Sequence, residues 1–176
     1  GERVAICDQL EDPKMTKKIV KRGVTELVTP GVSFNDEVLE QRKNNFLCGI
    51  YLDDKTHGIS FLDVSTGEFL IAEGNPEYLH KLISGFRPSE IIFQKNKKST
   101  FETLFNDRHY TFRLDEWIFT KDYAEETLNK HFQTKTLKGF GIQELPKATI
   151  AAGAIFHYLA ENQHKRLDHI TSISRI

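Results

Sequence analysis

The sequence predicts an α/β domain in which a mixed sheet is covered by helices. Three short apolar runs between residues 46 and 72 are separated by turns of three to five residues, and turns this short join antiparallel neighbours. Further apolar runs then alternate with segments of helical spacing. With 176 residues, 39% hydrophobic and 28% charged, the composition fits one full domain with a small appendage.

The first 43 residues predict a short strand–helix–strand strip and a linker. Residues 4–7 are apolar and predict a strand. Asp12 can cap a helix N-terminus and Pro13 suits the first helical position, so a helix is expected over 12–22, ended by Gly23. Residues 24–29 are rich in β-branched side chains and predict a second strand before the turn at Pro30. Residues 31–43 have no clean period and predict a linker or a short exposed helix.

The central part predicts seven elements in a recognisable order. Strands are expected over 46–52, 58–64 and 68–72, and a helix that begins at Pro76 is expected over 76–86. A strand over 90–94, a short helix over 99–106 and a strand over 110–114 follow. The order β-β-β-α-β-α-β, with helices after it, matches the ribonuclease H-like architecture.

Two helices and an extended segment complete the chain. Over 122–132, Ala124, Leu128 and Phe132 recur at i, i+4 and i+8, which predicts one buried face. The segment from 146 to about 163 is apolar around most of its circumference, so its helix must be covered on several sides. Residues 170–176 alternate apolar and polar side chains, which is typical of a strand or an extended connector.

Composition and the chain's opening restrict the class of protein. No apolar run approaches the roughly 18 residues that span a bilayer, and no secretory leader is visible, so membrane and secreted classes are not expected. Cys7 and Cys48 lie in separate apolar runs and predict buried free thiols in a reducing cytoplasm. The only methionine is Met15 and the chain runs from Gly1 straight into a strand, which predicts a fragment of a longer protein.

A ribonuclease H-like order raises the question of nuclease activity, because such enzymes hold two metal ions with carboxylates. The first strand carries no acid until Asp53 and Asp54 at its end, and the fourth offers only Glu90. Asp63, on the second strand, would lack partners. The set of carboxylates that a two-metal nuclease needs is therefore incomplete, and a fold alone does not give function. The sequence predicts neither a metal centre nor a catalytic residue.

Other candidate sites are weak. His157, Glu161 and His164 share one face of the last helix at i, i+4 and i+7, a spacing that could hold a metal. This face is nearly the only polar stripe of that helix, which favours a solvated stripe. Neither Gly-x-x-x-x-Gly-Lys-Ser/Thr nor Gly-x-Gly-x-x-Gly occurs, so no phosphate-binding loop or bound cofactor is expected in this chain.

A basic stripe is the main nucleic-acid candidate. Within residues 14–22 the basic side chains recur at i, i+3, i+4 and i+7, with one more beside them, and they are Lys14, Lys17, Lys18, Lys21 and Arg22. Such a stripe could contact a phosphate backbone. The formal net charge of −1, from 24 Lys+Arg against 25 Asp+Glu, favours a merely solvated helix face. Both interpretations stay open.

An ordered series of short motifs resembles the MutS family of DNA mismatch repair proteins and spans essentially the whole chain. In order, the motifs are RVAICDQLEDP (3–13), IVKR (19–22), VTPG (28–31), NFL (45–47), LDVSTGEF (62–69), GFG (139–141), AAGA (151–154) and ITSI (170–173). The resemblance implies four parts: the end of the mismatch-binding domain (1–30), a linker (31–43), a ribonuclease H-like connector domain without nuclease activity (44–169) and the start of the link to the core or lever domain (170–176).

The resemblance also implies that the mismatch-reading motif and the ATP site of this family lie outside this chain. The family probes a mismatch with a Phe-x-Glu motif, and none of the 13 phenylalanines here is followed two positions later by Glu. ATP and Mg²⁺ are bound in a distant domain of the family. We therefore expect this fragment itself to be no enzyme, and the full-length protein to be a cytoplasmic, homodimeric, DNA-dependent ATPase that binds mismatched duplex DNA.

For this fragment the resemblance implies mechanical coupling and a docking surface for MutL. The helix over 122–132 has a suitable outer face, formed by Lys121, Glu125, Glu126 and Lys130. The resemblance also brings the Lys14–Arg22 stripe close to the DNA backbone. Two alternatives remain: a free-standing nucleic-acid-binding module, and a degenerate nuclease-fold module that would need a divalent metal near Asp53, Asp54 or Asp63.

Overall fold

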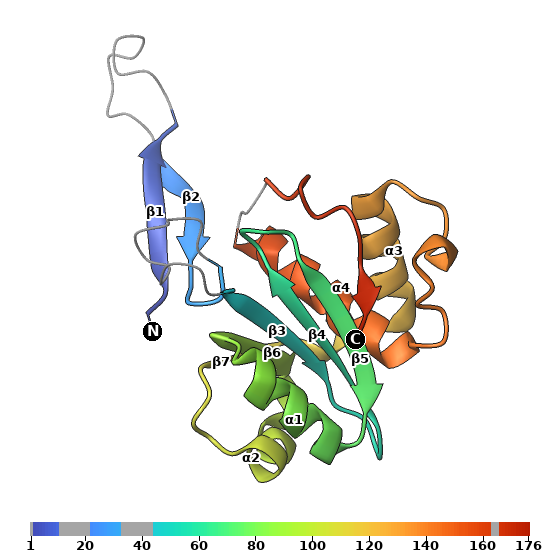
Figure 1. Cartoon of the computed structure of the whole chain (residues 1–176). Helices are drawn as coiled ribbons and strands as arrows, with labels where there is room; N and C mark the ends of the chain where they lie inside the picture. Colours follow the sequence, from blue (N-terminus) through green and yellow to red (C-terminus); the bar gives the residue numbers. More distant parts are fainter. Residues whose placement is uncertain (1, 11–21, 33–43, 163–165) are drawn as a thin grey trace, which may run out of the picture.

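The computed structural model describes residues 2–10, 22–32, 44–162 and 166–176 and contains two sheets (Figure 1). The strands are β1 (Val4–Gln9), β2 (Arg22–Val28), β3 (Phe46–Tyr51), β4 (His57–Asp63), β5 (Phe69–Gly74), β6 (Glu90–Gln94), β7 (Thr111–Leu114) and β8 (Ser174–Arg175). The helices are α1 (Pro76–Phe86), α2 (Lys98–Phe105), α3 (Lys121–Phe132) and α4 (Pro146–Glu161), with single 3₁₀ turns η1 (Lys95–Lys97), η2 (Glu116–Ile118) and η3 (Lys138–Phe140).

The larger sheet has the strand order β7-β6-β3-β4-β5-β8. Strands β3, β4 and β5 are antiparallel neighbours, whereas β6 runs parallel to β3 and β7 parallel to β6. This is the ribonuclease H-like arrangement, so the predicted fold class is confirmed. The C-terminal segment adds β8 parallel to β5, which confirms a strand there.

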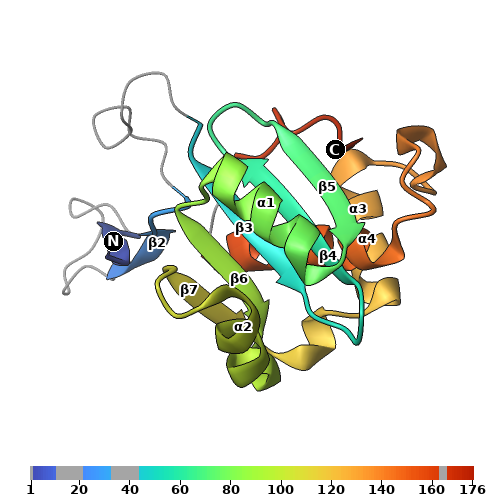
Figure 2. The same cartoon turned by 60° about the horizontal axis from the view of Figure 1, so that its bottom comes forward.

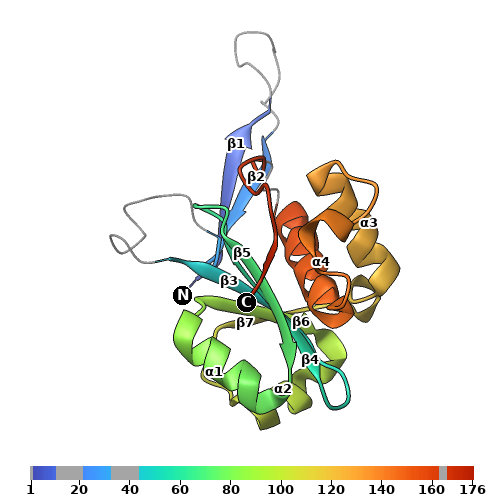
Figure 3. The ribbon, with the colours of Figure 1, turned by 45° about the vertical axis from the view of Figure 1, so that its right-hand side comes forward.

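Helices cover both faces of this sheet. Helices α1 and α2 lie on one face, and α4 lies on the other with α3 outside it (Figures 2 and 3). Successive side chains of a strand point to opposite faces, so Leu47 packs in the core beneath α4 whereas Cys48 packs in the core beneath α1. Strands β3, β4 and β6 are buried along nearly their whole length because both faces are covered.

Helix α4 lies in the middle of the domain, as its apolar circumference predicted. Eleven of its sixteen residues are buried, between the sheet and α3. No side chain of its own caps the N-terminus. Glu73 on β5 does so instead, because its carboxylate accepts from the backbone N–H groups of Lys147 at 2.5 Å and Ala148 at 3.1 Å.

The smaller sheet is the antiparallel β1–β2 ribbon, which stands away from the six-stranded sheet (Figures 1 and 3). Every residue of β1 is exposed. The expectation of a buried thiol is therefore wrong at Cys7, which is exposed, and confirmed at Cys48. The ribbon has no layer of described residues over its faces, so an apolar pattern does not produce burial there.

The predicted boundaries need comparison with the structure at the end of the expected helix and at the start of the linker. Arg22 and Gly23 belong to β2 and do not end a helix. Val32, near the start of the expected linker or short exposed helix, is fully buried and forms an isolated bridge with Thr29, so the exposed-helix alternative does not describe that residue. The rest of the predicted helix and linker falls on residues 11–21 and 33–43, outside the described residues. None of the helices in the described ranges combines the length and hydropathy needed to cross a membrane.

Candidate junction and docking site

A buried carboxylate joins the N-terminal ribbon to the six-stranded sheet. Glu90 is the first residue of β6 and has no exposed surface. Its Oε2 accepts hydrogen bonds from Thr29 Oγ1 at 2.5 Å and from the Gly31 N–H at 3.1 Å. Its Oε1 accepts a hydrogen bond from the Tyr158 hydroxyl on α4 and lies 3.8 Å from Nη1 of Arg3. We refer to Arg3, Thr29, Gly31, Glu90 and Tyr158 as the Glu90 cluster.

Arg3 closes this cluster from the ribbon side. Its Nη1 donates to the Tyr158 hydroxyl at 2.6 Å, and its guanidinium carbon lies 4.0 Å from the centre of the Phe112 ring on β7. Burial and the neighbouring Glu90 carboxylate raise the pKa of Tyr158. The hydroxyl therefore stays protonated and donates a hydrogen bond to Glu90. A buried carboxylate is stable only when its oxygens are satisfied, and this one is satisfied mainly by residues outside its own strand.

Hydrogen bonds to two backbone carbonyls extend the same junction. The Leu27 N–H of β2 donates to the carbonyl of Asn162, just after α4, at 3.1 Å. Asn45, which precedes β3, donates from Nδ2 to the Pro30 carbonyl at 2.9 Å. The end of the ribbon is therefore tied to the start of β3, to β6 and to α4.

The carboxylates considered for a nuclease are engaged elsewhere. Asp53 lies 3.0 Å from Lys147 Nζ, and this hydrogen-bonded ammonium lowers the pKa of Asp53. Asp63 accepts from the backbone N–H and the hydroxyl of Ser65, at 2.9 and 2.6 Å, and so shapes the turn before β5. Among the described residues, no group of three or more His, Cys, Asp or Glu side chains is arranged to hold a metal ion.

The buried environment of His57, beside Asp53, predicts that the folded chain loses stability in mild acid. It is buried, its Nδ1 accepts from the Asp53 N–H at 3.1 Å, and burial together with Lys147 lowers its pKa from 6.5. The unfolded chain therefore binds the proton first, so the free energy of unfolding should fall as the pH drops below about 6.5. His57→Asn retains an acceptor but does not titrate. It should reduce the dependence of urea-derived stability on pH between pH 7 and 5. A slope from His109 should remain, because burial also lowers the pKa of that side chain. An unchanged slope would contradict this assignment.

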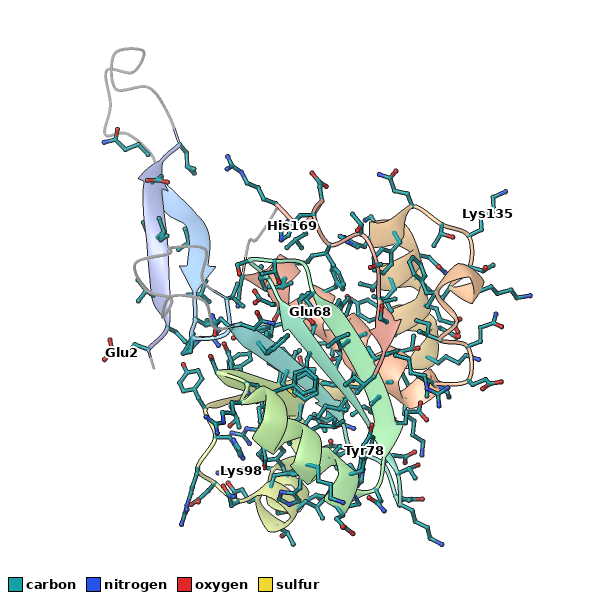
Figure 4. All side chains as sticks on the ribbon, viewed as in Figure 1. Glu2, Glu68, Tyr78, Lys98, Lys135 and His169 are labelled. Carbon is teal, nitrogen blue, oxygen red and sulfur yellow. The ribbon has the colours of Figure 1, made fainter. Side chains whose placement is uncertain are left out.

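The four residues predicted to form a docking face lie on α3. Ala124 and Leu128 are buried against α4, whereas Glu126 and Lys130 are exposed. Of the predicted set, Lys121 and Glu125 form an ion pair at 3.9 Å and are 63% and 45% exposed. In Figure 4, Lys135 beyond the end of α3 and Glu2 at the start of the ribbon lie on opposite sides of the molecule.

The solvated-stripe interpretation of the last helix is wrong at His157. Only 12% of this side chain is exposed. Its Nδ1 is hydrogen-bonded to the Tyr123 hydroxyl on α3 at 2.6 Å, and its Nε2 lies 3.3 Å from Glu161. The reason is that α3 covers the stripe at His157, which therefore contributes to the contact between the two helices, whereas Glu161 of the same stripe is 54% exposed. His164 lies outside the described residues.

The structure does not describe most of the basic stripe. Lys14, Lys17, Lys18 and Lys21 fall within residues 11–21, outside the described residues. Arg22 begins β2 and is therefore not part of the expected helix.

Sequence reasoning missed the Glu90 cluster as a unit. It considered Glu90 only as a metal ligand, although one signal was present: Glu90 precedes the apolar stretch Ile91 to Phe93 in a strand that had to be buried. Tyr158 gave a similar signal, since it brings a hydroxyl into an otherwise apolar helix. A polar group at a buried position needs a partner, but neither signal identifies it.

Comparisons with known proteins agree on one family. The family described as MutS domain II matches residues 45–171, and MutS domain I matches residues 1–37. DNA mismatch repair proteins MutS from Christiangramia forsetii and Flavobacterium johnsoniae are each 62% identical over all 176 residues, and that from Parabacteroides distasonis is 56% identical. The chain spans 20%, about a fifth, of the length of these curated relatives.

A solved structure is also similar at a low level. The crystal structure of the fowlpox virus resolvase with its substrate Holliday junction DNA aligns with a TM-score of 0.47 and 12% identity, covering 68% of this chain and 99% of that one. The two family matches and the high identity over the whole chain show that the chain belongs to the MutS family.

Proposed function

We propose that this chain is the connector of a MutS protein, which couples the domain that reads a mismatch to the ATPase and clamp domains. The observation that supports this most directly is the Glu90 cluster. Arg3, Thr29 and Gly31 lie within the match to MutS domain I, whereas Glu90 and Tyr158 lie within the match to MutS domain II. A buried network between two such segments transmits a displacement better than a flexible linker would, because its members cannot separate without exposing an unpaired charge.

Helix α4 can carry such a displacement further. Tyr158 contacts the ribbon through the Glu90 cluster, and the adjacent His157 contacts Tyr123 on α3. A Cβ atom on Gly153 of α4 would lie only 2.7 Å from Ala124, so the two helices are in close contact. Packed helices move as rigid elements. A movement of the ribbon would therefore reach the outer face of α3 through one helix.

Full-length protein carrying Glu90→Gln tests the coupling. The amide keeps the size of the side chain but removes the charge that binds Arg3 and the second acceptor oxygen. We expect the affinity for mismatched duplex and the ATPase rate without DNA to remain those of the wild type, while the stimulation of ATPase by mismatched DNA falls by about fivefold. Glu77→Gln, on the exposed side of α1, is the matched control. Wild-type stimulation in Glu90→Gln would refute the proposed coupling.

MutL docking is the second part of the proposal, on the face formed by Lys121, Glu125, Glu126 and Lys130. These side chains lie outside a helix that is firmly seated on α4, so the face can bind a partner without rearranging the core. Reversing two charges, with Glu126→Lys and Lys130→Glu, keeps the net charge and should weaken MutL binding by the full-length protein at least fivefold. Unaltered urea unfolding of the same variant is the control, and undiminished MutL binding would exclude this face.

The remaining features of the whole protein are proposals from family membership. They are binding of mismatched duplex DNA, binding of ATP and Mg²⁺ in a part outside this chain, a homodimeric state and a cytoplasmic location. For the basic stripe we propose contact with the DNA backbone, supported by the spacing of Lys14, Lys17, Lys18 and Lys21 in the sequence, with Arg22 next to them at the start of β2.

A further inference from the structure

The only tryptophan of the chain, Trp117, packs against two aromatic rings and leaves much of its surface exposed. Trp117 is 56% exposed, although its neighbours Ile118 and Phe119 in sequence are buried. Its ring meets the rings of Tyr123 and His157 edge-on, with centroids 5.1 and 5.4 Å apart. Tyr123 and His157 are themselves joined by a hydrogen bond. The indole is therefore oriented before any partner binds, which reduces the entropy lost on association.

The surroundings of Trp117 are acidic. Residues 115–126 contain five Asp or Glu and one Lys, although the whole chain has a net charge of only −1. Glu161, which is 54% exposed, reaches the same aromatic group through His157. Asp115 and Glu125 have lysine partners, but no ion pair joins Glu116 or Asp122 to another described residue. We refer to Trp117, Tyr123, Glu116, Asp122 and Glu161 as the Trp117 surface.

An exposed indole among carboxylates has a definite complement. Arginine and lysine bind the face of a tryptophan by cation–π contact, and arginine adds hydrogen bonds to carboxylates from the same guanidinium. Tryptophan is also one of the residue types enriched among the side chains that dominate the binding energy of protein interfaces. Like charges would exclude an acidic partner or a nucleic acid backbone from this surface.

We propose that the Trp117 surface is a docking site for an arginine- or lysine-bearing segment of MutL, with Trp117 as its anchor. This inference rests on the MutL docking proposed above and extends it from the outer face of α3 to η2, immediately before that helix. The charged face of α3 would then speed the encounter with MutL, whereas contacts of Trp117 would supply most of the binding free energy.

Binding of MutL to full-length protein, with ATP and mismatched duplex present, tests the inference. Trp117→Ala should weaken the affinity at least tenfold, and Trp117→Phe should restore part of the loss because it keeps an aromatic face. The pair Glu116→Gln and Asp122→Asn should weaken binding less and reduce its dependence on salt. Tyr78→Ala removes an aromatic ring that is 36% exposed on α1, across the sheet, and is the matched control that should leave binding unchanged.

Hydroxyl-radical footprinting of the Trp117 peptide, read by mass spectrometry, identifies what covers the indole. We expect oxidation in the full-length protein alone and protection when MutL is added. Protection without MutL would mean that another part of the same protein covers Trp117, and this would overturn the inference. Normal MutL binding by Trp117→Ala would overturn it while leaving the proposed docking on α3 intact. If the wild-type protein binds no MutL, both the docking proposal and this inference fail.

Discussion

Replacing Gly58 by alanine is expected to lower the free energy of unfolding of the 176-residue chain by about 3 kcal/mol or more, the upper end of the usual cost of overpacking. A Cβ atom at this position on β4 would lie 2.0 Å from the Lys147 carbonyl oxygen and 2.6 Å from the Ala148 nitrogen. Both atoms belong to the backbone of α4, so no side-chain rotation relieves the clash. Moving the helix would also break its capping by Glu73.

Urea unfolding followed by circular dichroism measures this effect, and Gly85→Ala supplies an opposite control. Gly85 lies inside α1, and a Cβ atom there meets nothing within 4 Å. Alanine is a better helix former than glycine by about 0.8–1.0 kcal/mol, so this variant should be slightly more stable than the wild type. If Gly58→Ala and Gly85→Ala had the same stability, α4 could not lie as close to β4 as described.

Glu90→Ala is the second substitution for which we expect a large effect, a loss of about 3–5 kcal/mol, as found when one partner of a buried charged group is removed. The change leaves the Thr29 hydroxyl and the Tyr158 hydroxyl without their acceptor and removes the ion pair to Arg3. It also opens a cavity at a position with no exposed surface. Glu77→Ala is the matched control, because this Glu is 78% exposed and its pair with Lys81 contributes little.

A double-mutant cycle separates the energy of the contact between Thr29 and Glu90 from the cost of removing a buried side chain. Thr29→Val keeps the shape of the side chain but removes the donor to Glu90. If the two residues interact, the double variant should lose less free energy of unfolding than the two single variants lose together. For residues in contact this difference is typically about 0.5–3 kcal/mol. Additive losses in urea unfolding would show that the ribbon and the sheet are not energetically joined at this point.

The local elements were predictable where the signals lie within a few residues. The helix over 76–86 and the strand over 90–94 have the predicted bounds. Asn75 caps the helix by accepting the Tyr78 N–H at 2.9 Å, and Pro76 occupies its first turn. The mixed sheet was predictable as well, because short turns require antiparallel neighbours whereas an intervening helix permits parallel ones.

The sequence by itself determined the family, the sheet and its covering helices, and the absence of a phosphate-binding loop. Only the tertiary structure decided the partners of Glu90, which lie 59 to 68 residues away for Thr29, Gly31 and Tyr158. It also decided that Cys7 is exposed and that His157 is covered. Periodicity shows which face of an element is apolar, but it does not show which distant segment covers that face. Burial and pairing are properties of the assembled layers, because they depend on contacts between residues far apart in the chain.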